Sequence, residues 1–294
     1  MRYPAHAAFF QPAQKRSAIW RLLLGIIVVG LVFALWLGGS FGLLRFLVGP
    51  ENIESWGERL RAPTSPFETY LVLSTFLGMV VATLAAALLL HRRGLLSLIG
   101  LNGRIRTDFI AGAGIAFAIL LISIALFLIR YIPEPNLSLP TWALLLPLSL
   151  LVIFIQSGAE ELLFRGYLQQ QLAARFASLL IWMLIPSALF GLAHFDPSGS
   201  GLAAPLVLAA TFIFGLCAAD LTAKTGSIAA AWGFHFANNC VALLAISLPG
   251  SISGLALYLT PFRAEDTEVV MPMILLDIAV TILIWAVLRR ALQR

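Results

Sequence analysis

The sequence predicts an all-α fold, a polytopic membrane bundle of about eight transmembrane helices. Of the 294 residues, 60% are hydrophobic and only 11% are charged, and the mean hydropathy is +0.95. A soluble domain carries about 25% charged and about 45–50% apolar residues. The chain has too few polar side chains to cover a water-soluble globule, which excludes soluble enzyme folds and disordered chains. No nucleic-acid partner is expected either, because no basic cluster with interleaved aromatic residues is present.

Eight apolar stretches are long enough to be considered as spans, since a spanning helix needs about 20 mostly apolar residues. They cover, within a few residues, 22–44, 69–90, 109–129, 141–162, 178–195, 202–221, 226–248 and 270–288. We interpret the first as a retained span and not as a cleaved signal peptide. Its apolar run is too long, and no small-x-small cleavage site follows it.

The distribution of lysine and arginine predicts that both termini are cytoplasmic. With that orientation, 14 of the 19 basic residues lie inside and 5 lie outside. The outer five are Arg45, Arg59, Arg61, Arg130 and Arg263. Because cytoplasmic loops are enriched in lysine and arginine, this bias supports an integral, multi-pass protein of the plasma (inner) membrane that is surrounded by membrane lipid.

Ionisable residues inside apolar helices are candidates for function, because each costs roughly 2.5–3.5 kcal/mol on insertion scales. The first such motif contains adjacent carboxylates, Glu160 and Glu161, followed by Arg165. Glu161 and Arg165 stand one helical turn apart, where an ion pair forms readily. Glu160 points about 100° away and has no basic residue three or four positions later. We therefore expect Glu161 to be paired locally and Glu160 to be left for another role.

Two further motifs place a histidine in an apolar helix. The first runs from Phe190 to His194, and the second runs from His235 to Asn239. A lone histidine in such a helix is usually a satisfied structural group. Two histidines and an unpaired glutamate in three different spans each need polar interaction partners inside the bundle. We therefore expect His194 and His235 to converge with Glu160 in one polar cavity.

A glutamate beside two imidazoles can perform hydrolysis in two ways. The glutamate can deprotonate a water molecule that attacks a carbonyl, while the second histidine and the amide of Asn239 stabilise the developing oxyanion. Alternatively, His194, His235 and a carboxylate such as Glu160 bind Zn²⁺, which lowers the pKa of a bound water to about 7. The residues alone leave both routes open.

The three motifs are Glu160-Glu161-x-x-x-Arg165, Phe190-x-x-x-His194 and His235-x-x-x-Asn239, in this order along the chain. They resemble the motifs of the CPBP family of intramembrane proteases. This family includes CAAX prenyl endopeptidases related to Rce1 and bacterial proteins known as Abi or bacteriocin self-immunity proteins. Each motif is short, but three in order within an apolar background are fairly specific. The resemblance covers about residues 141–248.

The resemblance implies an intramembrane endopeptidase in an eight-helix bundle. It implies that Glu160 acts as the base with His194, and that His235 and Asn239 form the oxyanion side. Within the family, a metal role has been argued alongside a metal-free glutamate mechanism. The eukaryotic relatives act on prenylated CAAX proteins, so the implied substrate here is a protein or peptide, lipidated or not. The chain would then divide into a three-span segment (1–140), a protease core (141–248) and an outer loop with the last helix (249–294).

Three other interpretations are weaker. The residues Gly38-Gly39-Ser40-Phe41-Gly42 match the Gly-x-Ser-x-Gly elbow of serine hydrolases, but that elbow requires a strand-to-helix turn, and here it ends a membrane helix. A non-catalytic immunity or scaffold protein could keep the same fold. A proton-coupled transporter could use the glutamate and histidines as proton carriers, although the paired broken helices of many transporters are absent.

Three further residues have structural expectations only. Asp220 is expected at the membrane interface, and Cys217 and Cys240 are expected to be buried thiols.

Overall fold

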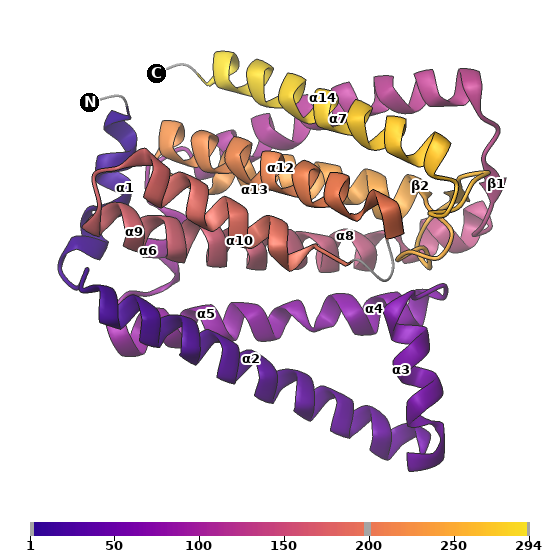
Figure 1. The fold of residues 1–294 in the computed structure, drawn as a ribbon, viewed down its shortest axis with the longest axis horizontal. Coiled ribbons are helices and arrows are strands. Elements are labelled where there is room, and N and C mark those ends of the chain that lie inside the picture. The colour runs from indigo at the N-terminus through magenta and orange to yellow at the C-terminus, as the bar shows by residue number, and fades with distance from the viewer. Residues whose placement is uncertain (1–2, 197–200, 293–294) are drawn as a thin grey trace.

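The computed structural model describes residues 3–196 and 201–292, and most of them belong to helices (Figure 1). The first half contains α1 (Pro4–Gln14), α2 (Ile19–Val48), η1 (Pro50–Asn52), α3 (Ile53–Arg61), α4 (Pro66–Ser74), α5 (Phe76–His91), α6 (Leu95–Ile99), α7 (Ile105–Arg130) and β1 (Glu134–Pro135). The second half contains α8 (Leu139–Glu161), η2 (Leu162–Gln169), α9 (Gln170–Arg175), η3 (Leu180–Leu184), α10 (Ile185–Ala193), η4 (Gly201–Ala203), α12 (Ala204–Thr225), α13 (Ala229–Cys240), η5 (Val241–Ala245), β2 (Ile246–Ser247), β3 (Tyr258–Leu259) and α14 (Thr267–Ala291).

The all-α, polytopic architecture is confirmed. Among the described residues, six helices are long and apolar enough to cross a membrane. They are Ile19–Val48, Pro66–His91, Ile105–Arg130, Leu139–Arg175, Ala204–Thr225 and Thr267–Ala291. The expected fifth and seventh spans, 178–195 and 226–248, are also helical, but the apolar helix Leu180–Ala193 and the helix formed by α13 and η5 are shorter. The count of eight therefore stays a prediction.

The fourth long helix is continuous from Leu139 to Arg175. Its N-terminus is capped by Ser138, whose side chain accepts a hydrogen bond from the Thr141 N–H. The π-helical segment η2 interrupts its regular α-helical pattern. At 37 residues the helix is about 55 Å long, well over the roughly 30 Å of a hydrocarbon core, so it extends beyond the bilayer.

Helix α2 is the least buried of the long helices. Its side chains project outward, as Leu35 at 75% exposure and Phe46 at 84% exposure illustrate. It contacts α5 and diverges from it along its length, and α3 spans the gap at the end farthest from the termini (Figure 1). Such continuous exposed apolar surface fits a helix that faces lipid.

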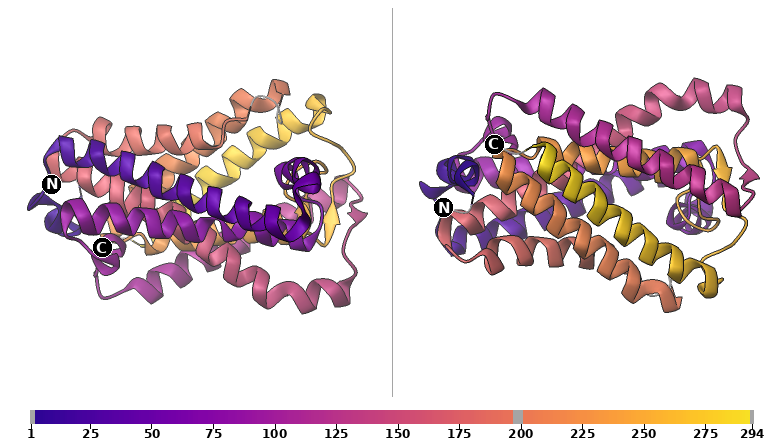
Figure 2. Two further views of the ribbon diagram at one scale, coloured as in Figure 1. Left: turned by 90° about the horizontal axis from the view of Figure 1, so that it is seen from below. Right: turned by 90° about the horizontal axis from the view of Figure 1, so that it is seen from above.

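The second half of the chain forms the packed part of the bundle. Helix α14 packs alongside α12, as the right-hand view of Figure 2 shows. Helix α7 packs closely along α13, because glycines remove side chains from the contact: a Cβ on Gly233 would lie 2.1 Å from the Phe109 carbonyl oxygen. Helix α7 belongs to the expected N-terminal segment 1–140, yet it packs along α13 of the expected core 141–248.

The two ends of the bundle differ. The N- and C-termini lie together at one end, where α1 packs against α9 and α12 (Figure 1). At the other end, three two-residue strands form a small sheet in the order β1-β3-β2. Strand β3 pairs antiparallel with β1, with Glu134 opposite Leu259, and parallel with β2, with Ile246 opposite Tyr258.

Candidate active site

Two carboxylates and two imidazoles meet inside the bundle. The Oε1 atom of Glu160 lies 3.8 Å from Nε2 of His194, and its Oε2 atom lies 3.2 Å from Nε2 of His235. Glu160 is 5% exposed and His235 is 4% exposed. The structure thus brings together the three ionisable residues that the sequence placed in three different helices.

A π-helical segment lies on or near each of the three motif-bearing helices. Glu160 and Glu161 are the last residues of α8, and η2 follows directly and contains Arg165. The segment η3 precedes α10, whose C-cap is His194, and η5 begins two residues after Asn239. π-Helical turns are rare and occur frequently at functional sites, because the wider turn re-aims the side chains around it.

Glu161 is fully buried and makes two charge-assisted contacts. Its Oε1 atom accepts a hydrogen bond from Nη1 of Arg165 at 2.9 Å, and it lies 2.9 Å from Nδ1 of His235. Arg165 is also buried, and its Nη2 donates to the carbonyl oxygen of Gly215. The expected pair with Arg165 is therefore present. The contact with His235 adds a second role for Glu161, which is to orient the imidazole.

The hydrogen bonds determine the tautomers of the histidines. A carbonyl oxygen can only accept, so Nδ1 of His194, 2.8 Å from the Phe190 carbonyl, carries a proton. In neutral His194, Nε2 then presents a lone pair toward Glu160. In His235, Nδ1 donates to Glu161, so a proton on Nε2 makes this ring a cation between two carboxylates.

Asn239 lies one turn beyond His235 on α13 and is held by an amide–amide contact. Its Nδ2 atom donates to Oε1 of Gln156 at 2.7 Å. Gln156 lies one turn before Glu160 on α8 and is 5% exposed. One Nδ2 hydrogen of Asn239 thus bonds to Gln156, and the second hydrogen does not take part in this bond.

A cavity of about 130 Å³ opens beside these groups. Its polar lining comes from His194, Thr211, His235, Asn238, Asn239, Asp277 and Thr281. Each water molecule occupies about 30 Å³ of liquid volume, so this space has room for a few water molecules or for part of a substrate.

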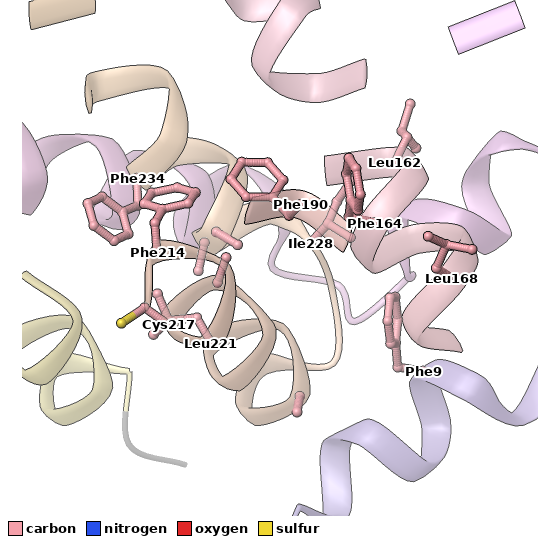
Figure 3. Packing of buried hydrophobic residues seen from close by; sticks show 14 of the residues in the cluster. Phe9, Leu162, Phe164, Leu168, Phe190, Phe214, Cys217, Leu221, Ile228 and Phe234 are labelled. Carbon is pink, nitrogen blue, oxygen red and sulfur yellow. The ribbon is translucent and has the colours of Figure 1, made fainter. Parts of the chain in front are cut away.

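Aromatic rings form the apolar side of the site. The ring of His235 lies 4.9 Å from the ring of Phe214 and 5.9 Å from that of Phe190. Figure 3 shows Phe190, Phe214 and Phe234 side by side in the core. The guanidinium of Arg165 lies over the ring of Phe190 at 4.6 Å. These rings exclude water on one side, which strengthens the electrostatic contacts among the charged groups.

The carboxylates keep unused acceptor capacity. Oε2 of Glu160 and Oε2 of Glu161 are buried and have no hydrogen-bond partner among the described residues. Glu160 Oε2 lies within ion-pair distance of His235 Nε2, but the two groups are not aligned for a hydrogen bond. A buried, unsatisfied carboxylate oxygen is costly, and in a native protein it indicates a functional role or a bound molecule.

The donor set does not fit a metal centre in its present arrangement. Within residues 3–196 and 201–292, no group of three or more histidine, cysteine, aspartate and glutamate side chains is placed to hold a metal ion. His235 has only its Nε2 atom for such a role, since Nδ1 is engaged by Glu161.

Other residues singled out in the sequence lie elsewhere. Gly38 to Gly42 are within α2, a continuous helix that runs on to Val48, so they form no elbow. Cys217 and Cys240 are buried, free thiols, as expected. Asp220, expected at the membrane interface, lies near the end of α12, where it is buried and bonded to side chains from both ends of the chain.

Two polar residues of this region, Gln156 and Asp277, belong to none of the three sequence motifs. Gln156 was overlooked because it is uncharged, although its spacing of one turn from Glu160 was a usable signal. Asp277 was overlooked because it stands alone in the last span, but a lone carboxylate in an apolar helix is itself a signal.

Taken together, the fold and the site define a polytopic helical membrane protein with a carboxylate–histidine cluster buried in its bundle. Residues 140–241 match the family model of type II CAAX prenyl endopeptidase Rce1-like proteins. The matched segment contains all three motifs, so the resemblance inferred from them is confirmed. The chain is also 28% identical over 254 residues to the uncharacterized protein YyaK of Bacillus subtilis (strain 168), with 84% of each chain covered. No solved structure shows a significant match.

Proposed function

We propose that the protein is an intramembrane endopeptidase that hydrolyses a peptide bond with a water molecule activated by Glu160 and His194. The observation that carries this proposal is the pair of distances from the Glu160 carboxylate to two imidazoles that both line the cavity, with one buried carboxylate oxygen of Glu160 left without a hydrogen bond. The match to the Rce1-like family supports the reaction class. A fixed carboxylate beside an imidazole is a suitable general base for water.

The chemistry follows from the hydrogen bonds. A water molecule placed between Glu160 and His194 gives one proton to the carboxylate as its oxygen forms a bond to the carbonyl carbon. The carbonyl oxygen becomes an oxyanion. When the C–N bond breaks, the protonated Glu160 returns this proton to the leaving amine, so that the base of the first step is the acid of the second.

His235 and Asn239 supply the oxyanion side in this proposal. Protonated His235 donates from Nε2, while its Nδ1 proton is held by Glu161. The free Nδ2 hydrogen of Asn239 provides a second donor. Donors fixed before the reaction stabilise the developing charge without reorganisation, and removal of one such donor typically costs about 10²–10³ in rate.

The test is proteolysis by purified protein in lipid nanodiscs, with a membrane-anchored peptide library as the probe and mass spectrometry to detect new termini. We expect cleavage by the wild-type protein and none by Glu160→Gln at equal amounts of folded protein. The exposed Glu54→Gln variant of α3 serves as the matched control and should cleave normally. A parallel reaction with a chelator tests the metal requirement. No cleavage by a folded wild-type protein would favour the non-catalytic scaffold.

We further propose that both termini are cytoplasmic and that the membrane is the inner membrane. The basic bias and the position of both termini at one end of the bundle support this orientation (Figure 1). Position 106 is at the start of α7, and Pro249 lies beyond β2, next to the sheet at which α7 ends. Reporter fusions after Arg106 and after Pro249 should therefore report opposite sides. If both report the same side, the topology is wrong.

A further inference from the structure

Asp277 is a carboxylate in the middle of the last long helix. It lies about 15 Å from the start of α14 and about 21 Å from its end, at 1.5 Å per residue. Among the described residues, it has no hydrogen-bond or ion-pair partner. An ionised aspartate at that depth is expensive in hydrocarbon, and such residues usually face a pathway or a ligand.

The surroundings of Asp277 connect it to the proposed site. It lines the cavity that His194, His235 and Asn239 also line. Thr281, one turn later on the same face of α14, lines that cavity too. The carboxylate therefore lies within the reach of a molecule bound beside the catalytic groups.

Asp277 also lines a second hollow, an apolar groove of about 300 Å³ between α7 and α14. The groove is lined by Leu120 and Phe127 of α7, by Ile246 and Phe262, and by Leu276 beside Asp277. It extends from the level of the catalytic cavity toward the end of the bundle that carries the small sheet. Among the described residues, only Asp277 lines both the groove and the cavity.

Charge decides which ligand fits at this junction. The catalytic cluster holds two glutamates and the guanidinium of Arg165, which is already engaged by Glu161 and Gly215. Asp277 adds another acceptor-only group, and among the described residues no lysine or arginine lines the cavity or the groove. A lysine or arginine side chain satisfies both the charge and the hydrogen-bonding capacity of a carboxylate, and its aliphatic stem packs well along an apolar wall.

We propose that Asp277 binds a lysine or arginine side chain of the peptide substrate, while the groove between α7 and α14 holds the neighbouring apolar residues of that peptide. The inference rests on the proposed peptidase function, because it takes the ligand of the cavity to be a peptide. It assigns to this chain a preference for substrates with a basic residue close to the cleaved bond and an apolar segment beside it.

The test measures binding without cleavage. Two fluorescent 12-residue peptides with the same apolar sequence carry either lysine or the uncharged norleucine at the centre. They are titrated against the Glu160→Gln protein in nanodiscs. We expect the lysine peptide to bind at least about tenfold more tightly, in line with a hydrogen bond to a charged group. In the Asp277→Asn, Glu160→Gln double variant this preference should disappear, and Asp277→Glu in the same background should retain much of it.

Glu268→Gln is the matched control, since it removes a carboxylate from the first turn of the same helix. It should leave the preference unchanged. Equal binding of both peptides to the Glu160→Gln protein, or an unchanged preference after Asp277→Asn, would overturn the inference. A retained lysine preference in a protein whose wild-type form cleaves nothing would overturn the peptidase function and leave the binding site standing. The melting temperature of each variant reports folding separately.

Discussion

Asp220 and Glu160 are both carboxylates buried in the same bundle, but their partners differ sharply. Asp220 accepts hydrogen bonds from the hydroxyl of Tyr3 at 2.6 Å, from Nε1 of Trp285 at 2.9 Å and from Nε of Arg289 at 2.8 Å. Glu160 faces two imidazoles, and one of its oxygens has no hydrogen bond in the described part of the chain. Donors from three side chains satisfy the Asp220 carboxylate, whereas the Glu160 carboxylate can still accept further hydrogen bonds.

The difference shows what each region does. The donors to Asp220 come from Tyr3, just before α1, and from α14, so this carboxylate links both segments to α12 by hydrogen bonds. A buried acceptor without a donor costs about 1–3 kcal/mol of stability. The site around Glu160 tolerates that cost, which is consistent with a group that bonds to water and substrate during a reaction.

The largest expected effect separates the two adjacent glutamates. Glu160→Gln should lower the cleavage rate by about 10²–10⁴-fold and leave the protein folded, because it removes the proposed general base. Glu161→Gln should act mainly through stability, since it breaks the buried contacts with Arg165 and His235. Arg165→Ala should resemble Glu161→Gln, because breaking a buried pair typically costs about 3–5 kcal/mol.

The measurement is the cleavage rate per unit of folded protein, with melting temperature recorded for each variant. Near-normal turnover in Glu160→Gln together with none in folded Glu161→Gln would reverse the two roles. Normal turnover in both variants would remove the carboxylates from the mechanism.

A second prediction concerns Asp220. Asp220→Asn should lower the free energy of unfolding by about 2 kcal/mol, because the amide replaces an ionised acceptor of charge-assisted hydrogen bonds. Cleavage per folded molecule should stay unchanged, since none of the Asp220 partners lines the catalytic cavity. Thermal unfolding of this variant and of the exposed control Glu265→Gln checks the stability effect. Lost turnover in a fully stable Asp220→Asn protein would contradict the structural assignment.

A third, smaller effect should come from Gln156, a positioning residue. Gln156→Ala frees the amide of Asn239 to rotate and should lower kcat about tenfold with little change in KM. If Gln156 acts only through Asn239, the double variant Gln156→Ala, Asn239→Ala should be no slower than Asn239→Ala alone. Additive losses in that double-mutant cycle would show an independent role for Gln156.

The smallest prediction concerns pH at the end that carries the termini. Burial of His6 in α1 lowers its pKa from 6.5 to about 4. Nε2 of His6 accepts a hydrogen bond from Gln169, and the imidazole lies against Trp182. Above pH 6.5 the ring is neutral whether or not α1 is docked. Between about pH 6.5 and 4 only the undocked form takes up a proton, so docking should weaken as the pH falls.

The check is the melting temperature of the wild-type protein and of His6→Gln between pH 7.5 and 5. The wild-type value should fall more steeply with acidification, and His6→Gln should be flatter across this interval. Parallel slopes for the two proteins would show that His6 does not control the docking of α1.

Much of the bundle could be predicted because lipid requires long apolar helices, and length and hydropathy are local properties of a sequence. The short helices α10 and α13 were harder to count, since their surroundings and not their own length decide whether they cross a bilayer. The helix α1 was not predicted, because its burial against α9 and α12 is a tertiary contact with little local signal.

The residues of the candidate site also divide into those with a local sequence signal and those that depend on tertiary contacts. Glu160, His194 and His235 could be identified because an ionisable group stands out in an apolar segment. The contact between His235 and Glu161 joins residues 74 positions apart, and no local spacing predicts it. Gln156 and Asp277 were missed because a single polar residue in a helix has many structural explanations until its neighbours in space are known.

The unequal lengths of adjacent helices have a consequence for the membrane itself. The helix from Leu180 to Ala193 spans about 21 Å, against a hydrocarbon thickness of about 30 Å, and His194 follows at its end. A bilayer adapts to such hydrophobic mismatch by thinning around the short helix. The headgroups and the water among them would then approach His194 at this point. The protein would thus thin the bilayer around it and bring water close to the proposed site of hydrolysis. Turnover in the proposed reaction should therefore depend on the acyl-chain length of the surrounding lipid.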